Sequence, residues 1–202
     1  MNLEELEKQV QLQEDIQEIE HLQKKYGYYF DTHRWQDIVD LFSDNAESVE
    51  IVDHGLFKGK KGVEHIYMDI IGARNTGPRP PWIAFVVMQI GGVVDVAPDG
   101  KTATGRWQTW LCESKPYGAY NRQEWLHGYY QNKYVKENGK WRFSKLHWNN
   151  TFCSPVEDGW LKLPLMGWMP LPDADAPPTA FHPYPDFLNV VPYPYKHPIT
   201  GK

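Results

Sequence analysis

Apolar residues recur every three or four positions along the start of the chain. They stand at Leu3, Leu6, Val10, Leu12, Ile16, Ile19, Leu22, Tyr26 and Phe30. This spacing predicts an amphipathic helix over residues 3–30. After a break near Asp31 to His33, the segment "RWQDIVDLF" predicts a second short helix. The segment "VEHIYMDII" predicts a third helix at residues 63–71.

Further along the chain the pattern becomes typical of strands. An early strand is predicted at 46–53, and later ones at 82–96, 102–112, 124–135 and 141–150. The run 82–96 is expected to bend at Gly91-Gly92. Turns or loops are expected at 55–62, at 113–122 and in the Gly/Pro stretch that ends at Pro81. Three helices followed by four mostly consecutive strands predict an α+β fold, with the helices packed on a curved, mostly antiparallel sheet.

The last part of the chain has a different composition. From Pro155 onward it holds eleven of the sixteen prolines, so no regular structure is expected there. Its large aromatic residues are Trp160, Trp168, Phe181, Tyr184, Phe187, Tyr193 and Tyr195. This content is too aromatic for a solvated linker. The sequence therefore predicts one domain over residues 1–152, and a tail over 153–202 that packs on this domain or on a neighbouring subunit.

The composition and charge of the chain limit the classes of function that it can have. The chain of 202 residues is 14% aromatic, which favours pockets for flat, partly polar ligands. A net charge of -5 argues against a nucleic-acid surface, and no apolar run is long enough for a membrane span. The start of the chain is too polar and acidic for a signal peptide. Cys112 and Cys153 match no metal or redox spacing, so reduced thiols and a cytoplasmic location are expected.

No cofactor or metal motif stands out. The eight histidines show none of the usual zinc-binding spacings, and the chain has no P-loop, G-x-S-x-G or G-x-G-x-x-G. The chemistry left is acid/base catalysis without a cofactor, or plain binding of a ligand.

Two groups of residues are candidates for that chemistry. Asp31 lies among aromatic residues, whose low polarity suits a general acid or base, although Asp31 also suits a helix terminus. Alternation places Trp125, His127 and Tyr129 on one face of a strand, and His147 and Asn149 on one face of the next. If both sets face the concave side, they line a cavity. If they face the other way, a non-catalytic binding module gains support.

The segment "YGYYFDTHRWQDIVDLFSDNAE", followed by "GLFKGKKGVEHIY", resembles the opening of the SnoaL-like superfamily, cone-shaped relatives of nuclear transport factor two. The resemblance covers about residues 10–152 and implies a cone-shaped α+β barrel. Within the superfamily the nearest pattern is that of the scytalone and bile-acid dehydratases. Their catalytic Asp falls on Asp31, four residues before Trp35, and the bile-acid dehydratase Tyr falls on Tyr26.

Counting from "NGKWRF" places the family's catalytic His on His127 and its substrate-binding Asn on Asn149. A second family His falls near Met88, where this chain has no imidazole, and His147 is a candidate to replace it.

The resemblance implies a cofactor-independent lyase that acts on a hydroxylated aromatic small molecule, by dehydration or quinone-methide elimination. One relative removes formaldehyde from lignin-derived diarylpropanes. Asp31 and His127 would form a coupled pair, and Tyr26 would donate a proton to the leaving hydroxyl. The expected substrate-binding residues are Asn149, His147, Met88, Trp125 and Tyr129. A dimer or trimer is expected. The alternatives are a non-catalytic binding module, a polyketide cyclase or steroid isomerase, and a structural scaffold whose cavity is filled by its own side chains.

Overall fold

The computed structural model describes residues 2–52, 54–73, 85–117, 120–162, 171–179 and 193–201. Its helices are α1 Leu3–Asp31, α2 Trp35–Asp40, α3 Gly59–Glu64, which continues into the π-helix η1 His65–Gly72, and α4 Gly159–Lys162. Its strands are β1 Ser48–Ile51, β2 Gly55–Lys58, β3 Phe85–Val96, β4 Thr102–Tyr117, β5 Tyr120–Glu137 and β6 Lys140–Pro155.

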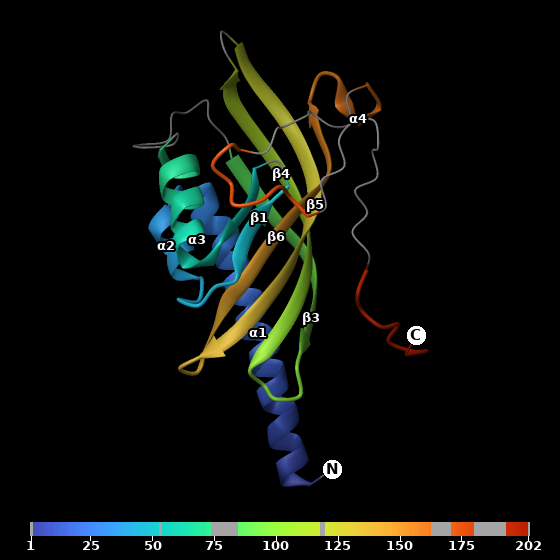
Figure 1. Cartoon of the computed structure of the whole chain (residues 1–202). Helices are drawn as coiled ribbons and strands as arrows, with labels where there is room; N and C mark the ends of the chain where they lie inside the picture. The colour runs from blue at the N-terminus through green and yellow to red at the C-terminus, as the bar shows by residue number, and fades with distance from the viewer. Residues whose placement is uncertain are drawn as a thin grey trace.

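The six strands form one sheet in the order β2-β1-β6-β5-β4-β3. Every neighbouring pair is antiparallel except β1 and β6, which run parallel. In Figure 1 the long strands curve in front of α1, and α2 and α3 lie to one side. The predicted α+β fold with helices on a curved sheet is confirmed.

Several boundaries differ from the sequence expectation. The predicted turn at 55–62 contains β2 and the start of α3, because Gly55 and Gly59 adopt positive φ angles of 114° and 66° and let the chain turn at both ends of a short strand. The predicted loop at 113–122 is largely strand, since β4 and β5 extend into it as one long hairpin. The short helix α4 forms in the tail, where no regular structure was expected.

The predicted bend in β3 is confirmed. The register against β4 shifts between Ile90 and Gly92, and Gly91 has a φ of 53°. A side chain at Gly92 would overlap the Trp107 ring, so the bend also depends on a residue without Cβ there. The predicted Gly/Pro loop up to Pro81, and residues 82–84 of the predicted strand, lie outside the described residues.

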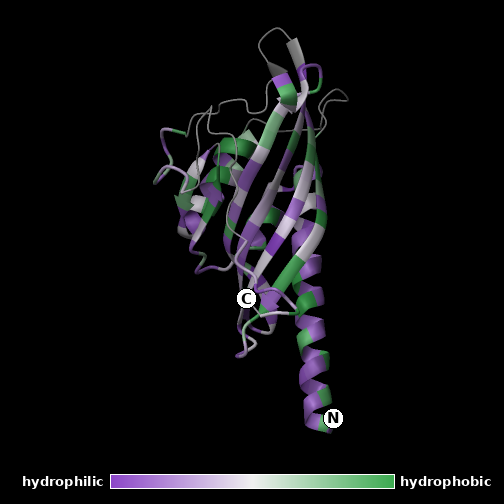
Figure 2. Cartoon of the chain, turned by 90° about the vertical axis from the view of Figure 1, so that its right-hand side faces the viewer, coloured by the Kyte–Doolittle hydropathy of each residue, from purple (hydrophilic) through white to green (hydrophobic). Residues whose placement is uncertain are grey.

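The core lies between α1 and one face of the sheet. Tyr26 of α1 meets the Tyr130 ring at 5.6 Å and the Phe143 ring at 5.9 Å, both edge-on. The start of α1 extends beyond the sheet, as Figure 2 shows, so the predicted apolar positions there remain exposed. The periodic pattern predicted the helix correctly, but only its second half has a partner to pack on.

A buried amide network fixes α1 against the sheet. Gln23 of α1 donates to the side chain of Gln89 at 3.0 Å. Its oxygen accepts from Asn132 at 2.9 Å and from the Tyr134 hydroxyl at 3.0 Å. The Tyr134 hydroxyl in turn accepts from the Trp107 indole at 2.8 Å. Most polar groups in this part of the interior are thus paired with one another, and the buried side-chain nitrogen of Gln89 is an exception among the described residues.

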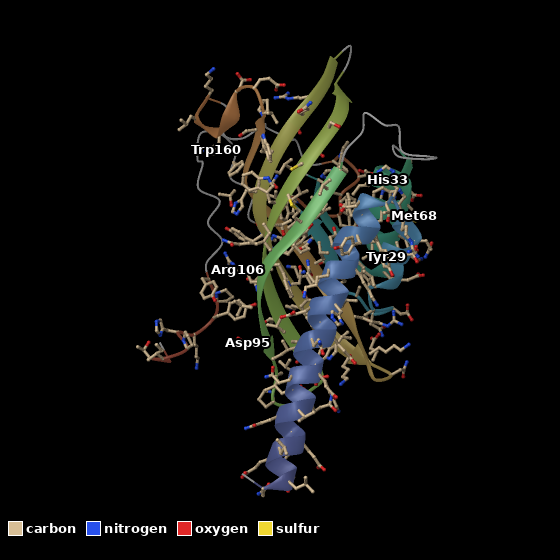
Figure 3. All side chains as sticks on the ribbon, turned by 180° about the vertical axis from the view of Figure 1, so that it is seen from behind. Tyr29, His33, Met68, Asp95, Arg106 and Trp160 are labelled. Atoms are coloured by element: carbon tan, nitrogen blue, oxygen red, sulfur yellow. The ribbon has the colours of Figure 1, made fainter. Side chains whose placement is uncertain are left out.

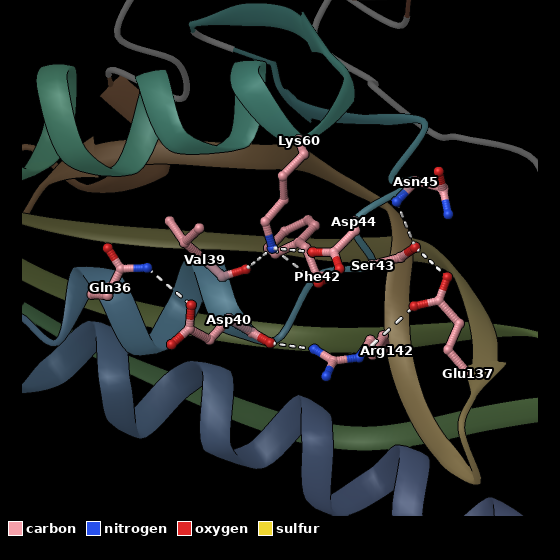
Figure 4. Close-up of polar contacts among 10 residues, drawn as sticks. All are labelled: Gln36, Val39, Asp40, Phe42, Ser43, Asp44, Asn45, Lys60, Glu137 and Arg142. Atoms are coloured by element: carbon pink, nitrogen blue, oxygen red, sulfur yellow. Dashed lines mark hydrogen bonds and ion pairs between the residues drawn. The ribbon is translucent and has the colours of Figure 1, made fainter.

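Polar contacts also anchor α2, as Figure 4 shows. The Lys60 amine donates to the carbonyl oxygens of Val39 and Phe42 at 2.7 and 3.0 Å, at the end of the helix where carbonyls lack partners within it. Ser43, just beyond, donates to Glu137 at 2.7 Å. These contacts position the segment between α1 and β1. Among the described residues, no helix has both the length and the apolar character needed to cross a membrane.

Described parts of the tail lie against the domain. Ala176 pairs with Leu56 of β2 through backbone hydrogen bonds of 2.9 and 3.3 Å. Asp175 accepts from the Lys58 amide, and Asp173 lies 2.8 Å from a ring nitrogen of His65. Trp168, Phe181, Tyr184 and Phe187 lie outside the described residues, and the packing of the whole tail stays a prediction.

Candidate functional site

The sheet has two faces, and contacts with α1 identify the inner one. Tyr130 of β5 contacts Tyr26 and therefore lies on the inner face, toward the helices. His127 is three residues earlier on β5. The extra residue of the local irregularity lies on β6, so β5 alternates without interruption and His127 lies on the outer face. Its ring stacks on Phe152 at 5.6 Å and lies 6.1 Å from Trp110.

Asp31 lies at the end of α1, on the inner side. One carboxylate oxygen accepts the backbone N–H of Val87 at 2.8 Å, so the group is fixed against β3 and half-buried. The chain leaves α1 through His33, whose positive φ of 57° lets it turn sharply into α2. Figure 3 shows His33 on the side of the molecule where the helices lie, and its ring stacks on Trp35 at 5.2 Å.

Aromatic rings line the inner side near Asp31. The Phe30 ring stacks on Phe85 at 4.8 Å and meets Trp35 edge-on at 5.1 Å. The Trp35 indole nitrogen is buried and has no hydrogen-bond partner among the described residues. The site at the end of α1 thus combines a fixed carboxylate with a wall of rings and an unused donor.

Tyr26 lies deep in the core and is paired with a second tyrosine. Its hydroxyl lies 3.1 Å from the hydroxyl of Tyr67 of η1, and both side chains are fully buried. Burial, followed by the effect of Tyr67, raises the pKa of Tyr26 well above its ordinary value. Both phenols therefore stay protonated and act as hydrogen-bond donors.

The expected pairing of Asp31 with His127 does not form in this structure. The two residues lie on opposite sides of the sheet: Asp31 contacts β3 from the helix side, and His127 packs among outer rings. Burial there lowers the pKa of His127, which favours the neutral imidazole. The physical reason is strand alternation, which assigns each residue to one face only.

Three more predicted residues share the outer face with His127. Trp125 lies 5.4 Å from the Trp110 ring, and Tyr129 lies under the guanidinium of Arg106 at 4.1 Å. Met88 pairs in register with Trp110 and is 41% exposed. The prediction that Trp125, His127 and Tyr129 share a face is thus met, but that face points away from Asp31. Figure 3 shows Arg106 and Trp160 on the side of the molecule away from α2 and α3.

His147 and Asn149 also lie on the outer face, where they pair in register with Glu50 and Tyr129. The Nε2 atom of His147 is 3.1 Å from a carboxylate oxygen of Glu50, although its alignment falls short of a hydrogen bond. Glu50 was not a candidate in the sequence, because a single acid in a short strand gives no signal of its own.

A β-bulge explains why Asn150 faces the interior instead. Between Phe143 and Lys145 the strand β6 carries the extra residue Ser144, which reverses the alternation beyond it. Trp148 and Asn150 therefore face inward, and Asn150 pairs with Gly128. Asn150 is buried, and in the described part of the chain its side-chain oxygen has no hydrogen-bond partner. Sequence alternation counted from Phe143 misses this residue.

Two further acids on the inner face were not predicted either. Glu113 and Glu124 pair across β4 and β5, in the row of Phe85, and both are buried. The Arg122 guanidinium lies 3.2 Å from Glu124. Within the described part of the chain, no group of three or more His, Cys, Asp or Glu side chains is placed to hold a metal ion.

Comparisons with known proteins agree with this fold. The model of the SnoaL-like domain family matches residues 11–147. No curated protein is similar to the chain in sequence.

Solved structures share the architecture at low sequence identity. A putative scytalone dehydratase from Novosphingobium aromaticivorans is 16% identical, with a TM-score of 0.61 over 83% of this chain and 99% of that one. A hexachlorocyclohexane dehydrochlorinase, LinA type 2, is 17% identical, with a TM-score of 0.61 over 73% and 93%. An NTF2-like protein with a cystatin-like fold from Novosphingobium aromaticivorans is 16% identical, with a TM-score of 0.53 over 80% and 94%.

These likenesses concern the fold, while the family match rests on the sequence itself. The matched region contains Asp31 and Tyr26 together with most of α1 and most of the sheet. The chain belongs to the SnoaL-like domain family.

Proposed function

We propose that the chain is a cofactor-independent lyase that acts on a hydroxylated aromatic small molecule at the end of α1. The observation that carries this proposal is the Asp31 carboxylate, held by the Val87 amide at 2.8 Å beside the rings of Phe30 and Phe85. A fixed carboxylate in surroundings of low polarity suits proton transfer, and the rings suit a flat substrate. Similar folds in a dehydratase and a dehydrochlorinase support an elimination.

The structure changes the roles expected from sequence. In an elimination, Asp31 takes a proton from the carbon or phenol oxygen of the substrate and gives it to the leaving hydroxyl, which departs as water. The carboxylate is thereby restored, so one residue serves as both base and acid. The Tyr26–Tyr67 pair keeps its protons, because the pKa of Tyr26 is raised by burial, and it serves as a hydrogen-bond donor only. Asn150 orients the substrate through its unpaired oxygen.

The second candidate is a non-catalytic binding module. It is favoured by the two strand histidines, since His127 and His147 both lie on the outer face and neither meets Asp31. In that case the aromatic wall holds a ligand without chemical change, and Asp31 contributes only to recognition.

A screen of para-hydroxylated benzylic alcohols and diarylpropanes, read by mass spectrometry, separates the two candidates. The lyase produces a compound lighter by one water or, where the side chain also breaks, by one water and one formaldehyde. The variant Asp31→Asn abolishes this product, whereas Asp44→Asn, on a side chain that is 95% exposed, retains it. Saturable binding without any product favours the binding module, and equal turnover by Asp31→Asn contradicts the assigned role.

We also propose that copies of the chain associate through the outer face. Trp110, Trp125 and Phe152 form a ring cluster there, and Trp160 of α4 extends it at 5.1 Å from Phe152. Trp160 is itself 52% exposed. Light scattering measures the molecular mass in solution and tests whether the chain is a dimer or a trimer. A monomer at all concentrations contradicts this proposal.

A further inference from the structure

The first turns of α1 carry an apolar stripe that the described part of the chain leaves exposed. Leu3, Leu6 and Val10 are 71%, 43% and 49% exposed. Val10 stands nine residues before the buried Ile19, which is about two and a half turns, so it lies on the side of the helix opposite the core. Leu3 and Leu6 follow the same side at spacings of three and four. Because this stripe points away from the sheet, α1 cannot bury it by packing on that sheet.

Residues 3–14 of α1, here called the arm, form a well-capped helix. The Asn2 side chain accepts the backbone N–H of Glu5 at 2.8 Å, and the Glu5 carboxylate accepts the backbone N–H of Asn2 at 2.9 Å. Lys8 pairs with Glu4 at 2.8 Å, one turn apart. Figure 2 shows the arm continuing past the end of the sheet. The cap and the ion pair stabilise the turns that carry the stripe.

Negative charge accompanies the stripe. The first twenty residues hold seven acidic side chains and one lysine, a net charge of -6, whereas the whole chain carries -5, so the remaining residues carry a net +1. Glu7 and Glu14 each stand four residues after a member of the stripe and therefore flank it. Neither of them forms an ion pair among the described residues. Two arms packed on each other would bring these acids together, which makes arm-to-arm pairing unfavourable.

The outer face of β3 offers a matching apolar surface. Met88, Ile90 and Val93 form a column there and are 41%, 50% and 40% exposed. The bulge at Gly91 keeps Val93 on the same face as Ile90, although the two are three residues apart. The column is about 15 Å long. The stripe on the arm spans about 10 Å of helix, so the column is long enough to receive it.

Positive charge lies beside this column. Arg106 of β4 pairs in register with Val93, and its guanidinium lies over the Tyr129 ring at 4.1 Å. Lys101, in the turn between β3 and β4, is exposed. Asp95 follows at the end of the column on β3 itself. The acids that flank the stripe therefore fit on the β4 side, beside Arg106 and away from Asp95.

We propose that the arm of one copy packs on the β3 column of a second copy, with the apolar stripe against the column and the flanking acids beside Arg106. Each chain carries both surfaces, and their charges are opposite, so every copy gives an arm and receives one. The contact extends the association proposed through the outer ring cluster, because Met88 pairs in register with Trp110 of that cluster. It does not depend on any reaction at Asp31.

Sedimentation velocity of the full chain tests this contact. The double variant Leu6→Gln/Val10→Gln keeps good helix formers at both positions and should weaken association by at least about ten-fold. Leu12→Gln is the matched control. Leu12 is 41% exposed on the same arm but stands seven residues before Ile19, on the core side, so this variant should associate like the wild type. High salt should also weaken the association of the wild type.

Cross-linking identifies the surface that receives the arm. In a Cys112→Ser background, Val10→Cys mixed with Val93→Cys should form a disulfide between copies, and Val10→Cys mixed with Lys140→Cys, at an exposed turn, should not. A chain that is monomeric at all concentrations, or Val10→Cys that cross-links to itself instead, would overturn the proposal. If Phe152→Ala separates the copies while Leu6→Gln/Val10→Gln leaves them associated, the ring cluster joins them and the arm contact is wrong.

Discussion

Two buried groups of polar side chains, one on each face of the same sheet, differ in their hydrogen bonding. On the inner face, Gln23, Asn132 and Tyr134 satisfy one another in a closed network. On the outer face, Asn149 is just as buried, and its amide makes no hydrogen bond within the part of the chain that the structure describes. Polar groups that only stabilise the fold are paired within the chain, so we assign a structural role to the inner network. Unpaired groups, such as Asn149 outside and Asn150 inside, are the better candidates for ligand contact.

The same comparison applies to aromatic residues. The inner rings of Tyr26, Phe143 and Tyr130 are packed by α1 on one side and by strands on the other. The outer rings of Trp110 and Phe152 pack on each other and on further outer rings, among them His127. Stability should therefore depend on the inner face, and association on the outer one.

Truncating a ring on each face of β6 should give the largest contrast. Phe143→Ala removes a ring that is 0% exposed and should lower the free energy of unfolding by about 3–5 kcal/mol. Phe152→Ala removes a half-buried outer ring and should cost about 1 kcal/mol or less. Urea unfolding of both variants measures the difference, and equal losses would show that the outer cluster is also core.

Breaking the inner network should have the next largest effect. Gln23→Ala leaves the buried amide of Asn132 and the hydroxyl of Tyr134 short of a partner, at a cost of about 1–3 kcal/mol. Gln17→Ala, on an exposed turn of the same helix, is the matched control and should change stability by less than about 0.5 kcal/mol. A neutral result for Gln23→Ala would mean that water replaces the network without cost.

Docking of the tail segment 171–179 should depend on pH in both directions. The pKa of Glu50 is lowered to about 2, so its contribution is complete above the ordinary value of a glutamate and is lost as the pH falls toward 2. Contact with Asp69, then with Asp173, raises the pKa of His65. The His65 contribution is therefore complete below the ordinary value of a histidine and is lost as the pH rises through the raised value.

Limited proteolysis measures this dependence. Cleavage within 171–179 should be slowest at mildly acidic pH and faster on either side of it. Glu50→Gln should accelerate cleavage at every pH above about 5, because the amide replaces the anion that Thr179 donates to. A rate that is independent of pH and of Glu50 would contradict the role of these contacts.

The smallest effect is expected at Asn149. Asn149→Leu removes an amide that has no partner, so stability should stay within about 1 kcal/mol of the wild type or increase slightly. Thermal unfolding without ligand measures it. A loss of several kcal/mol would mean that the amide is satisfied in the folded chain after all.

Sequence periodicity predicted where the helices and strands lie, but it did not predict which face of the sheet the side chains of β6 occupy. The three- and four-residue spacing identified α1, and Gly91-Gly92 marked the bend in β3. The face of His147 and Asn149 depends on a bulge at Ser144, which no residue type in that segment signals. The extra residue Ser144 reverses the alternation as far as a second irregularity at Thr151, so Asn150 replaces Asn149 on the inner side.

Contacts between residues far apart in the chain could not be predicted from the sequence either. Glu50 and Thr179 are 129 residues apart, and only the fold brings the tail to β1. The carboxylate of Asp31 was found because aromatic residues surround it in the chain itself. Its contact with Val87, by contrast, follows from the packing of α1 on β3.

Asp31 and His127 lie on opposite sides of the sheet and are therefore not a coupled pair. NMR titration of the His127 imidazole, in the wild type and in Asp31→Asn, tests this separation without any substrate. We predict that His127 titrates below the ordinary value of a histidine, because burial lowers its pKa, and that its pKa is the same in both proteins. If His127 instead titrates above that ordinary value and its pKa falls when Asp31 is replaced, the two residues are a coupled pair.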